Sequence, residues 1–232
     1  MSLQFIMGNS GSGKSYCLYD TVVREAIENP DKNYLVIVPE QFTMQTQKDL
    51  CLAHPKGGIM NIDVLSFGRL AYRVFEEVGQ DARVVLDDEG KNLVLRKIAG
   101  ECEKDLKVFK GNLKKQGYIS EVKSVLSEFA QYGVDFERLD DFMKEVPPES
   151  YLHYKLDDIR TIYEKFEEYL SEKYITKEEM LDVLSDAVPY SDILKGSVVA
   201  MDGFTGFTPV QNRLIGELFS VCEKVMITVT MD

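Results

Sequence analysis

The first part of the chain alternates short apolar runs with segments whose apolar residues recur at helical spacing. An apolar run at residues 3–7 leads into a glycine-rich turn, and residues 16–27 then repeat apolar side chains every three or four positions. Two further β-type runs follow, at residues 34–38 and 60–65. Each is followed by a segment with helical spacing, at residues 43–53 and 70–78 respectively. This alternation predicts a parallel sheet whose strands are joined by helical crossovers.

The middle of the chain has a different pattern. Between Asp87 and about Leu194 it is rich in charge, has almost no strand signal, and is punctuated by Pro147, Pro148 and Pro189. Apolar periodicity predicts amphipathic helices there, at residues 88–103, 118–132, 135–144, 152–173 and 176–187. We therefore expect a helical insertion in the α/β fold.

Strand character returns near the end of the chain. An apolar run at residues 197–201 is followed by a turn, a predicted helix and a last β-type run, the latter two at residues 209–220 and 224–230. The predicted fold is α/β, a parallel sheet with helices on both faces, divided into residues 1–85, an insertion at 86–195, and residues 196–232. In an open sheet of this kind the last strand is usually followed by another crossover. Here the last predicted strand ends just before Asp232, so we expect the chain to be a fragment of a longer protein.

Charge and composition narrow the possible classes. The formal net charge is -12 and the pI is about 4.8, which argues against a general electrostatic attraction to nucleic-acid phosphates. No apolar run approaches the roughly 20 residues of a membrane-spanning helix, so we expect a cytoplasmic protein without membrane contact. The cysteines are scattered without the spacing of a zinc or iron–sulfur site.

The glycine-rich turn carries the pattern G-x-x-x-x-G-K-S between a strand and a helix, and this context makes it specific for phosphate binding. Its glycines permit positive φ and let successive backbone N–H groups surround phosphate oxygens, while the helix N-terminus adds partial positive charge. We expect Lys14 to reach the β- and γ-phosphates and the Ser15 hydroxyl to bind magnesium. The predicted ligands are therefore ATP and Mg²⁺, held by Gly8, Asn9, Ser10, Gly11, Ser12, Gly13, Lys14 and Ser15.

A nucleoside triphosphatase with such a loop also needs an acidic residue at the end of a neighbouring strand. Later in the chain, the apolar run at residues 198–201 is followed directly by Asp202. This aspartate is the predicted partner of Ser15 in binding magnesium. Many ATP-driven motors place a glutamate directly after this aspartate to orient the attacking water. Here that position is Gly203, so no catalytic residue is assigned and weak or no autonomous hydrolysis is expected.

Four segments together resemble a known family. They are GNSGSGKS at 8–15, VPEQFT at 38–43, DVLSF at 63–67 and MDGFTGFTPVQ at 201–211. In this combination they resemble the N-terminal part of the AddB (RexB) family, which supplies one of the two subunits of a bacterial ATP-dependent helicase–nuclease that processes DNA double-strand ends. The resemblance implies a P-loop RecA-like fold: residues 1–85 and 196–232 as a superfamily 1 helicase-like 1A domain, and residues 86–195 as a 1B-like helical insertion.

The resemblance also implies where DNA and a partner would bind. In related helicases the segments that resemble residues 39–43 and 66–67 lie where single-stranded DNA crosses the domain. The candidate DNA-facing residues are Gln41, Phe42, Thr43, Ser66 and Phe67. Phe42 and Phe67 could stack on bases or pack in the core, and the sequence leaves both possibilities open. The implied partners are an AddA-like helicase–nuclease subunit and single-stranded or double-stranded-end DNA.

The leading hypothesis is therefore an ATP-binding, helicase-like module of a DNA-processing enzyme complex. The principal alternative is a P-loop kinase of a small metabolite or nucleoside, which usually supplies arginines in a mobile lid. The insertion contains few arginines, among them Arg96, Arg138 and Arg160, and no tight basic cluster. A third possibility is a degenerate binding module in which the loop is a relic and the insertion contacts other proteins.

Overall fold

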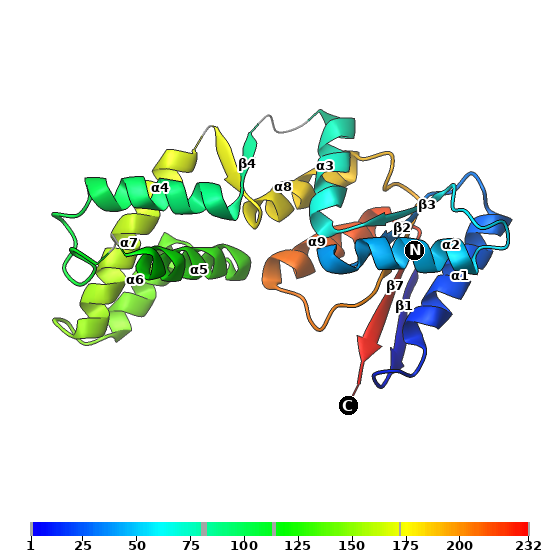
Figure 1. The fold of residues 1–232 in the computed structure, drawn as a ribbon, viewed down its shortest axis with the longest axis horizontal. Coiled ribbons are helices and arrows are strands. Elements are labelled where there is room, and N and C mark those ends of the chain that lie inside the picture. Colours follow the sequence, from blue (N-terminus) through cyan, green and yellow to red (C-terminus); the bar gives the residue numbers. More distant parts are fainter. Residues whose placement is uncertain (1, 80–82, 113–114, 172, 232) are drawn as a thin grey trace. The chain divides into compact units, whose positions relative to one another are not determined.

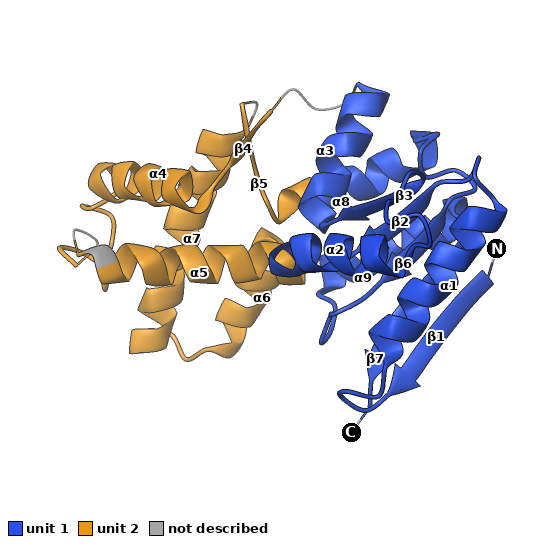
Figure 2. Ribbon diagram, turned by 45° about the vertical axis from the view of Figure 1, so that its right-hand side comes forward, with its two compact units in different colours: residues 1–81, 181–232 blue, residues 82–180 orange. Residues whose placement is uncertain are grey.

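The structure is a computed structural model that describes residues 2–79, 83–112, 115–171 and 173–231. It divides into two compact units, the first formed by residues 1–81 and 181–232 and the second by residues 82–180 (Figure 2). Each unit has its own hydrophobic core. Asp232, the residue at which we expected an incomplete sheet, lies outside the described residues.

The first unit is built on a five-stranded sheet with the strand order β1-β7-β6-β2-β3 (Figure 1). Its strands are β1 (Ser2–Gly8), β2 (Tyr34–Ile37), β3 (Ile62–Leu65), β6 (Val198–Met201) and β7 (Lys224–Thr230). All neighbouring pairs of these strands run parallel, so the parallel sheet predicted from the alternating pattern is confirmed. The central strands β2 and β6 are buried along their whole length, which explains why they are continuously apolar.

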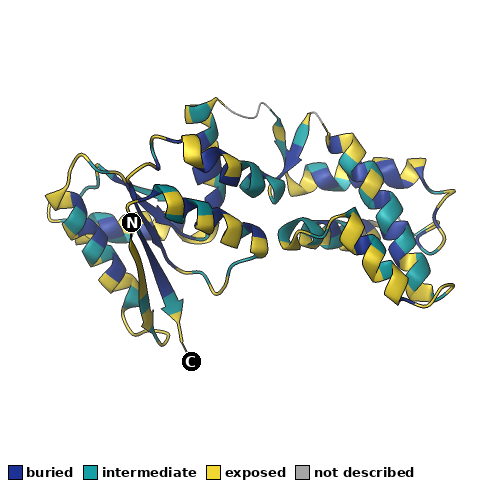
Figure 3. Ribbon diagram, turned by 180° about the vertical axis from the view of Figure 1, so that it is seen from behind, coloured by how far each residue is buried: buried dark blue, intermediate teal, exposed yellow. Residues whose placement is uncertain are grey.

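Helices flank this sheet. They are α1 (Lys14–Glu28), α2 (Thr43–Ala53), α3 (Phe67–Val78) and α9 (Pro209–Val221), with short 3-10 turns η1 (Glu40–Phe42) and η2 (Val188–Tyr190). Leu18 and Val22 of α1 pack in one core cluster with Val36, Ala200 and Met226 from three strands. Buried residues accordingly concentrate on the central strands and the inner sides of the helices, whereas residues on the outer sides are exposed (Figure 3).

Strand β1 forms one edge of the described sheet, and its two faces differ in burial. Ile6 packs against the core cluster that contains α1. Leu3, Phe5 and Met7 alternate with it, so they point to the other face, and they are 47%, 48% and 59% exposed. In the described part of the chain this strand therefore combines an edge position with three exposed apolar side chains.

The second unit is mainly helical but also contains a small sheet. Its elements are β4 (Val84–Leu86), α4 (Asp88–Glu101), α5 (Gln116–Tyr132), α6 (Phe136–Glu145), α7 (Tyr151–Leu170) and β5 (Tyr174–Thr176), and α8 (Glu179–Ala187) crosses the boundary between the units. Strands β4 and β5 pair in parallel. The sequence pattern predicted neither of these strands, because three-residue strands are too short to produce a recognisable alternation.

The same small sheet explains two misplaced helix boundaries. Helix α7 ends at Leu170, before β5, rather than at residue 173, and α8 begins at Glu179 rather than at residue 176. Thr176 and Glu179 exchange hydrogen bonds: the Thr176 N–H donates to the Glu179 carboxylate over 2.8 Å, and the Glu179 N–H donates to Thr176 Oγ1 over 3.3 Å. This reciprocal pair of hydrogen bonds fixes the start of α8 as a capping box does.

Within the described ranges, no helix combines the length and apolar character needed to cross a bilayer.

A buried aspartate organises the loop between α4 and α5. Asp158 of α7 is 1% exposed, and its carboxylate accepts hydrogen bonds from the backbone N–H groups of Lys107, Val108 and Phe109 at 2.8, 2.7 and 2.8 Å. These three donors lie outside the helices and strands of the unit, so the carboxylate replaces a missing backbone acceptor for each. The loop is thereby held against α7.

We expect Asp158→Ala to destabilise the second unit by on the order of 3 kcal/mol, because it leaves three backbone donors unsatisfied in a buried site. Urea unfolding followed by circular dichroism measures the loss. The neighbouring Asp157→Ala provides the control, since the Asp157 side chain makes an exposed ion pair with Lys107 and such pairs contribute little. Equal stability of the two variants would contradict the role assigned to Asp158.

Candidate functional site

The carboxyl ends of the parallel strands meet at one edge of the sheet, and the residues singled out for phosphate and magnesium binding lie there. The glycine loop, residues 8–15, follows β1 and runs into α1, whereas Asp202 follows β6. Strand β7 separates these two strands, with Gly8 level with Thr230 and Met201 level with Ile227. At the usual strand spacing, β1 and β6 are therefore about 10 Å apart.

The backbone of the glycine loop requires its glycines. Gly11 and Gly13 have φ of 76° and 86°, a region that other L-residues rarely occupy. A Cβ at Gly8 would lie 2.6 Å from Ser12 Oγ, so a side chain there would force the Ser12 hydroxyl to turn away. Gly13 directly precedes α1 and has no side chain, so no side chain at this position accepts hydrogen bonds from the first turn of the helix. The N–H groups of a helix N-terminus bind anions readily, so the loop fits a phosphate group.

Lys14 folds back over the loop. Its ammonium group donates to the carbonyl oxygens of Gly8 and Asn9 at 2.9 and 2.8 Å. The positive charge is thus held at the mouth of the loop rather than in the surrounding solvent. The other loop residues after Gly8 are mostly exposed, among them Asn9, Ser10, Gly11, Ser12, Gly13 and Ser15. A ligand can therefore reach both the N-terminus of α1 and the lysine.

Asp202 is 6% exposed, and both of its carboxylate oxygens accept hydrogen bonds from hydroxyl groups. Thr228 donates to Oδ1 over 2.6 Å and Tyr19 donates to Oδ2 over 2.7 Å. The Tyr19 oxygen also lies 3.2 Å from Thr46 Oγ1. Burial, the largest cause, and the Asp202 carboxylate raise the pKa of Tyr19, so its hydroxyl remains a proton donor throughout the physiological range.

Sequence reasoning missed these three hydroxyl residues, although a weak signal exists for one of them. Tyr19 follows Ser15 by one helical turn, which places both on the same side of α1. Thr228 lies beside Asp202 because Ile227 is level with Met201 in the sheet, and the sequence does not record this register. For Thr46 nothing in the sequence indicates the contact, because it depends on how α2 packs against α1.

Gly203, the residue after Asp202, has a left-handed backbone with φ of 78°. A Cβ at this position would lie 3.5 Å from both the Phe42 ring and Pro39, so there is space for a side chain but the backbone disfavours one. The residue after Asp202 therefore has a backbone conformation that favours glycine over glutamate. Replacing the side chain alone would not restore a water-orienting carboxylate in an unstrained geometry.

The five candidate DNA-facing residues divide into exposed and buried ones. Gln41 is exposed and Phe42 is 46% exposed. By contrast, Thr43, Ser66 and Phe67 are buried. The first two are therefore available to a ligand, and the other three make contacts within the unit.

The contacts of the buried residues hold the adjoining turns. Thr43 donates to the Glu40 carbonyl oxygen over 2.9 Å, and the Ser66 hydroxyl donates to the Glu40 carboxylate. Ser66 also caps α3 by accepting from the Arg69 N–H. The Phe67 ring centroid lies 5.3 Å from that of Phe204, a normal separation for packed aromatic rings.

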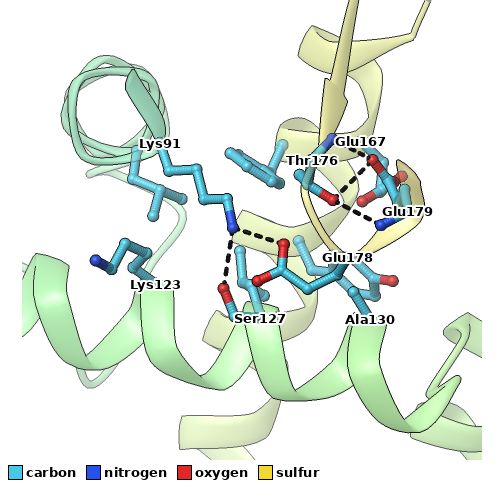
Figure 4. Close-up of a pocket in the computed structure, with 12 residues that line it drawn as sticks. Lys91, Lys123, Ser127, Ala130, Glu167, Thr176, Glu178 and Glu179 are labelled. Atoms are coloured by element: carbon cyan, nitrogen blue, oxygen red, sulfur yellow. Dashed lines mark hydrogen bonds and ion pairs between the residues drawn. The ribbon is translucent and has the colours of Figure 1, made fainter. Parts of the chain in front are cut away.

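A separate polar cluster lies inside the second unit (Figure 4). The buried Lys91 ammonium points between Ser127 at 3.2 Å and the Glu178 carboxylate at 2.7 Å. The adjoining cavity measures about 10 Å³, which is about the room needed for one water molecule. Among the described residues no three His, Cys, Asp or Glu side chains gather closely enough to hold a metal ion. The Lys91 contacts join α4 to α5 and to the turn before α8.

Two carboxyl groups of this cluster, Glu167 and Glu179, interact directly. Burial is the largest cause that raises the pKa of Glu167, from an ordinary 4.5 to about 7, and the charge and hydrogen bond of Glu179 add to it. Glu179 is itself engaged by the Thr176 hydroxyl at 2.9 Å. Glu167 consequently binds its proton more tightly in the folded chain than in the unfolded one.

Because this pKa is raised on folding, the stabilising contribution of the Glu167 proton is complete at low pH and is lost as the pH rises through about 7. We expect the second unit to be less stable at pH 8 than at pH 6 by at most about 1 kcal/mol, because solvent screens the partly exposed carboxyl group. Glu167→Gln should abolish most of this difference in the thermal midpoint. The exposed neighbour provides a control variant, Glu168→Gln, and an unchanged pH dependence in Glu167→Gln would contradict the assignment.

The fold and this edge of the sheet define a class: an α/β protein with a glycine loop and a buried aspartate at the carboxyl ends of parallel strands. Residues 5–232 match the family described as "ADDB, N-terminal". The chain therefore belongs to the AddB N-terminal family, as its sequence motifs indicated.

Curated relatives agree with this assignment. The chain is 48% identical over its full length to the B-type subunit of an ATP-dependent helicase/deoxyribonuclease from Lachnoclostridium phytofermentans, and 39% and 35% identical to the proteins of the same name from Clostridium kluyveri and Alkaliphilus metalliredigens. In each case the match covers 100% of this chain and 20% of the relative. The chain thus spans about a fifth of the length of these relatives.

Proposed function

We propose that this chain is the ATP-binding, helicase-like N-terminal part of a subunit in a DNA-processing helicase–nuclease. The observation that carries the proposal is the glycine loop at the carboxyl edge of the sheet, with an uncapped helix N-terminus and Lys14 folded over it. The relatives are named as subunits of an ATP-dependent helicase/deoxyribonuclease. Membership in their family favours this function over that of a small-molecule kinase.

In this proposal the loop residues bind the phosphates of ATP, and two side chains provide oxygen ligands for Mg²⁺. Lys14 would exchange its carbonyl partners for phosphate oxygens, and the N–H groups at the start of α1 would donate to them. The Ser15 hydroxyl and the Asp202 carboxylate would hold the cation, which neutralises phosphate charge. The sheet would then correspond to a RecA-like 1A domain and the second unit to a 1B-like domain.

Weak or absent hydrolysis by this chain alone is part of the proposal. Asp202 is followed by a glycine with φ of 78°, so the turn carries no adjacent carboxylate to orient water. The chain would then contribute nucleotide binding to an enzyme whose hydrolysis depends on a partner, an AddA-like subunit. The complex would work on DNA ends in the cytoplasm.

Nucleotide binding is tested with Lys14→Ala. We expect the affinity for ATP in the presence of Mg²⁺ to fall at least about tenfold, because the variant loses the charge that reaches the phosphates. Isothermal titration calorimetry measures this affinity. Lys32→Ala is the matched control, since Lys32 makes an ion pair with Glu223 on the surface. If the unmodified protein binds no nucleotide, the proposed function is wrong.

For DNA we propose that Gln41 and Phe42 form the contact surface, because they are the exposed members of the candidate set. Stacking of a base on an aromatic ring contributes about 1–3 kcal/mol, so we expect Phe42→Ala to weaken the binding of single-stranded DNA by at least about fivefold. Fluorescence anisotropy measures this affinity. Tyr72→Ala, which removes another exposed aromatic side chain of the same unit, should leave it unchanged. Equal losses in both variants would argue against a specific contact.

A further inference from the structure

Asp202 is held by a set of hydroxyl groups that nothing in the sequence motifs requires. The donors come from two elements that are distant in the sequence: Tyr19 of α1 and Thr228 of β7. The backbone of Asp202 is also tied, because its N–H donates to the Ile37 carbonyl oxygen over 3.1 Å. Both the position and the orientation of this carboxylate are therefore fixed before any ligand binds.

We propose that Tyr19 is a positioning residue for the Asp202 carboxylate, and that its hydroxyl sets the strength with which this carboxylate holds a divalent cation. The proposal rests on the nucleotide-binding function proposed above. It adds a residue outside the glycine loop and outside the acidic turn to the nucleotide site.

The position of Tyr19 in α1 supports this role. It follows Ser15 by about one turn of helix, so the two side chains leave the same side of α1. Ser15 is the proposed hydroxyl ligand of the cation, and Tyr19 contacts its proposed carboxylate partner at 2.7 Å. One helix thus carries one ligand of the cation and the group that orients the other.

The hydrogen-bond capacity of the carboxylate leaves room for the cation. An ionised carboxylate offers about four lone-pair sites, and the two hydroxyl donors occupy one on each oxygen. One site on each oxygen remains for a cation or for its bound water. Because the donors approach opposite oxygens, the carboxylate cannot rotate without losing one of these bonds.

Thr46 of α2 completes the arrangement. The single Tyr19 proton is donated to Asp202, so across the 3.2 Å contact Thr46 must be the donor and the Tyr19 oxygen the acceptor. The resulting chain runs from Thr46 through Tyr19 to Asp202. Hydrogen bonds in such chains polarise one another, and Thr46 is itself buried, which keeps the phenol in place.

The inference is tested by comparing ATP affinity with Mg²⁺ and with EDTA in the complete natural polypeptide that carries these residues. Tyr19→Phe removes only the hydroxyl. Since it costs the carboxylate one charge-assisted hydrogen bond, we expect it to reduce the gain in affinity produced by Mg²⁺ at least about fivefold, while the affinity in EDTA stays within about twofold of the unmodified protein. Titration with Mn²⁺, followed by electron paramagnetic resonance in the presence of ATP, should show the same weakening of cation binding.

Three further variants make the result specific. Thr228→Val should act in the same direction as Tyr19→Phe, and Thr228→Ser, which keeps a hydroxyl, should retain the Mg²⁺ effect. Tyr34→Phe is the matched control, because Tyr34 is another buried tyrosine of the first unit but stands at the start of β2, away from the carboxyl edge. It should bind ATP like the unmodified protein under both conditions.

The possible failures are distinguishable. If Asp202→Asn abolishes the Mg²⁺ effect and Tyr19→Phe retains it, the positioning role is wrong and the nucleotide function stands. A Tyr19→Phe variant that loses affinity equally in Mg²⁺ and EDTA, with a lowered melting temperature, would show a purely structural role and would also overturn the inference. Absence of ATP binding by the unmodified protein would overturn the proposed function and the inference together.

Discussion

The pairing of β7 between β1 and β6 is the constraint on which the candidate site depends. Strand β1 pairs with β7 along its whole length, from Ser2 to Gly8, and β6 pairs with the other side of β7. This register brings the end of β1, where the glycine loop begins, and the end of β6, where Asp202 stands, to one edge of the sheet. The same strand supplies Thr228, so β7 both spaces the two halves of the site and contacts one of them directly.

Much of this arrangement could be predicted from the sequence because it is encoded locally. The glycine loop lies between a strand and a helix that follow each other in the chain, and the helix at residues 43–53 has the bounds that its periodicity predicts. Strands β4 and β5 could not be predicted, since a three-residue strand is defined by its partner rather than by its own pattern. The helix predicted for residues 152–173 extends too far for the same reason, because its predicted end runs up to the unrecognised strand β5.

The contacts around Asp202 were beyond prediction for a different reason. Tyr19 and Asp202 are separated by 183 positions, and their contact depends on α1 packing in the same core cluster as Ala200, near the end of the strand that precedes Asp202. Phe42 and Phe67 illustrate the same limit, since one is 46% and the other 7% exposed. Whether an aromatic residue in the segment after a strand faces solvent or the core depends on tertiary packing that no local pattern records.

The exposed face of β1 has a practical consequence for anyone who handles this polypeptide. Strand β1 is an edge strand, and its residues Leu3, Phe5 and Met7 are exposed on one face. Such a strand is a template to which another extended chain can pair as an additional strand. In a concentrated preparation, self-association of this polypeptide is therefore expected to begin at this strand, and charged substitutions on its open face are the simplest means of reducing it.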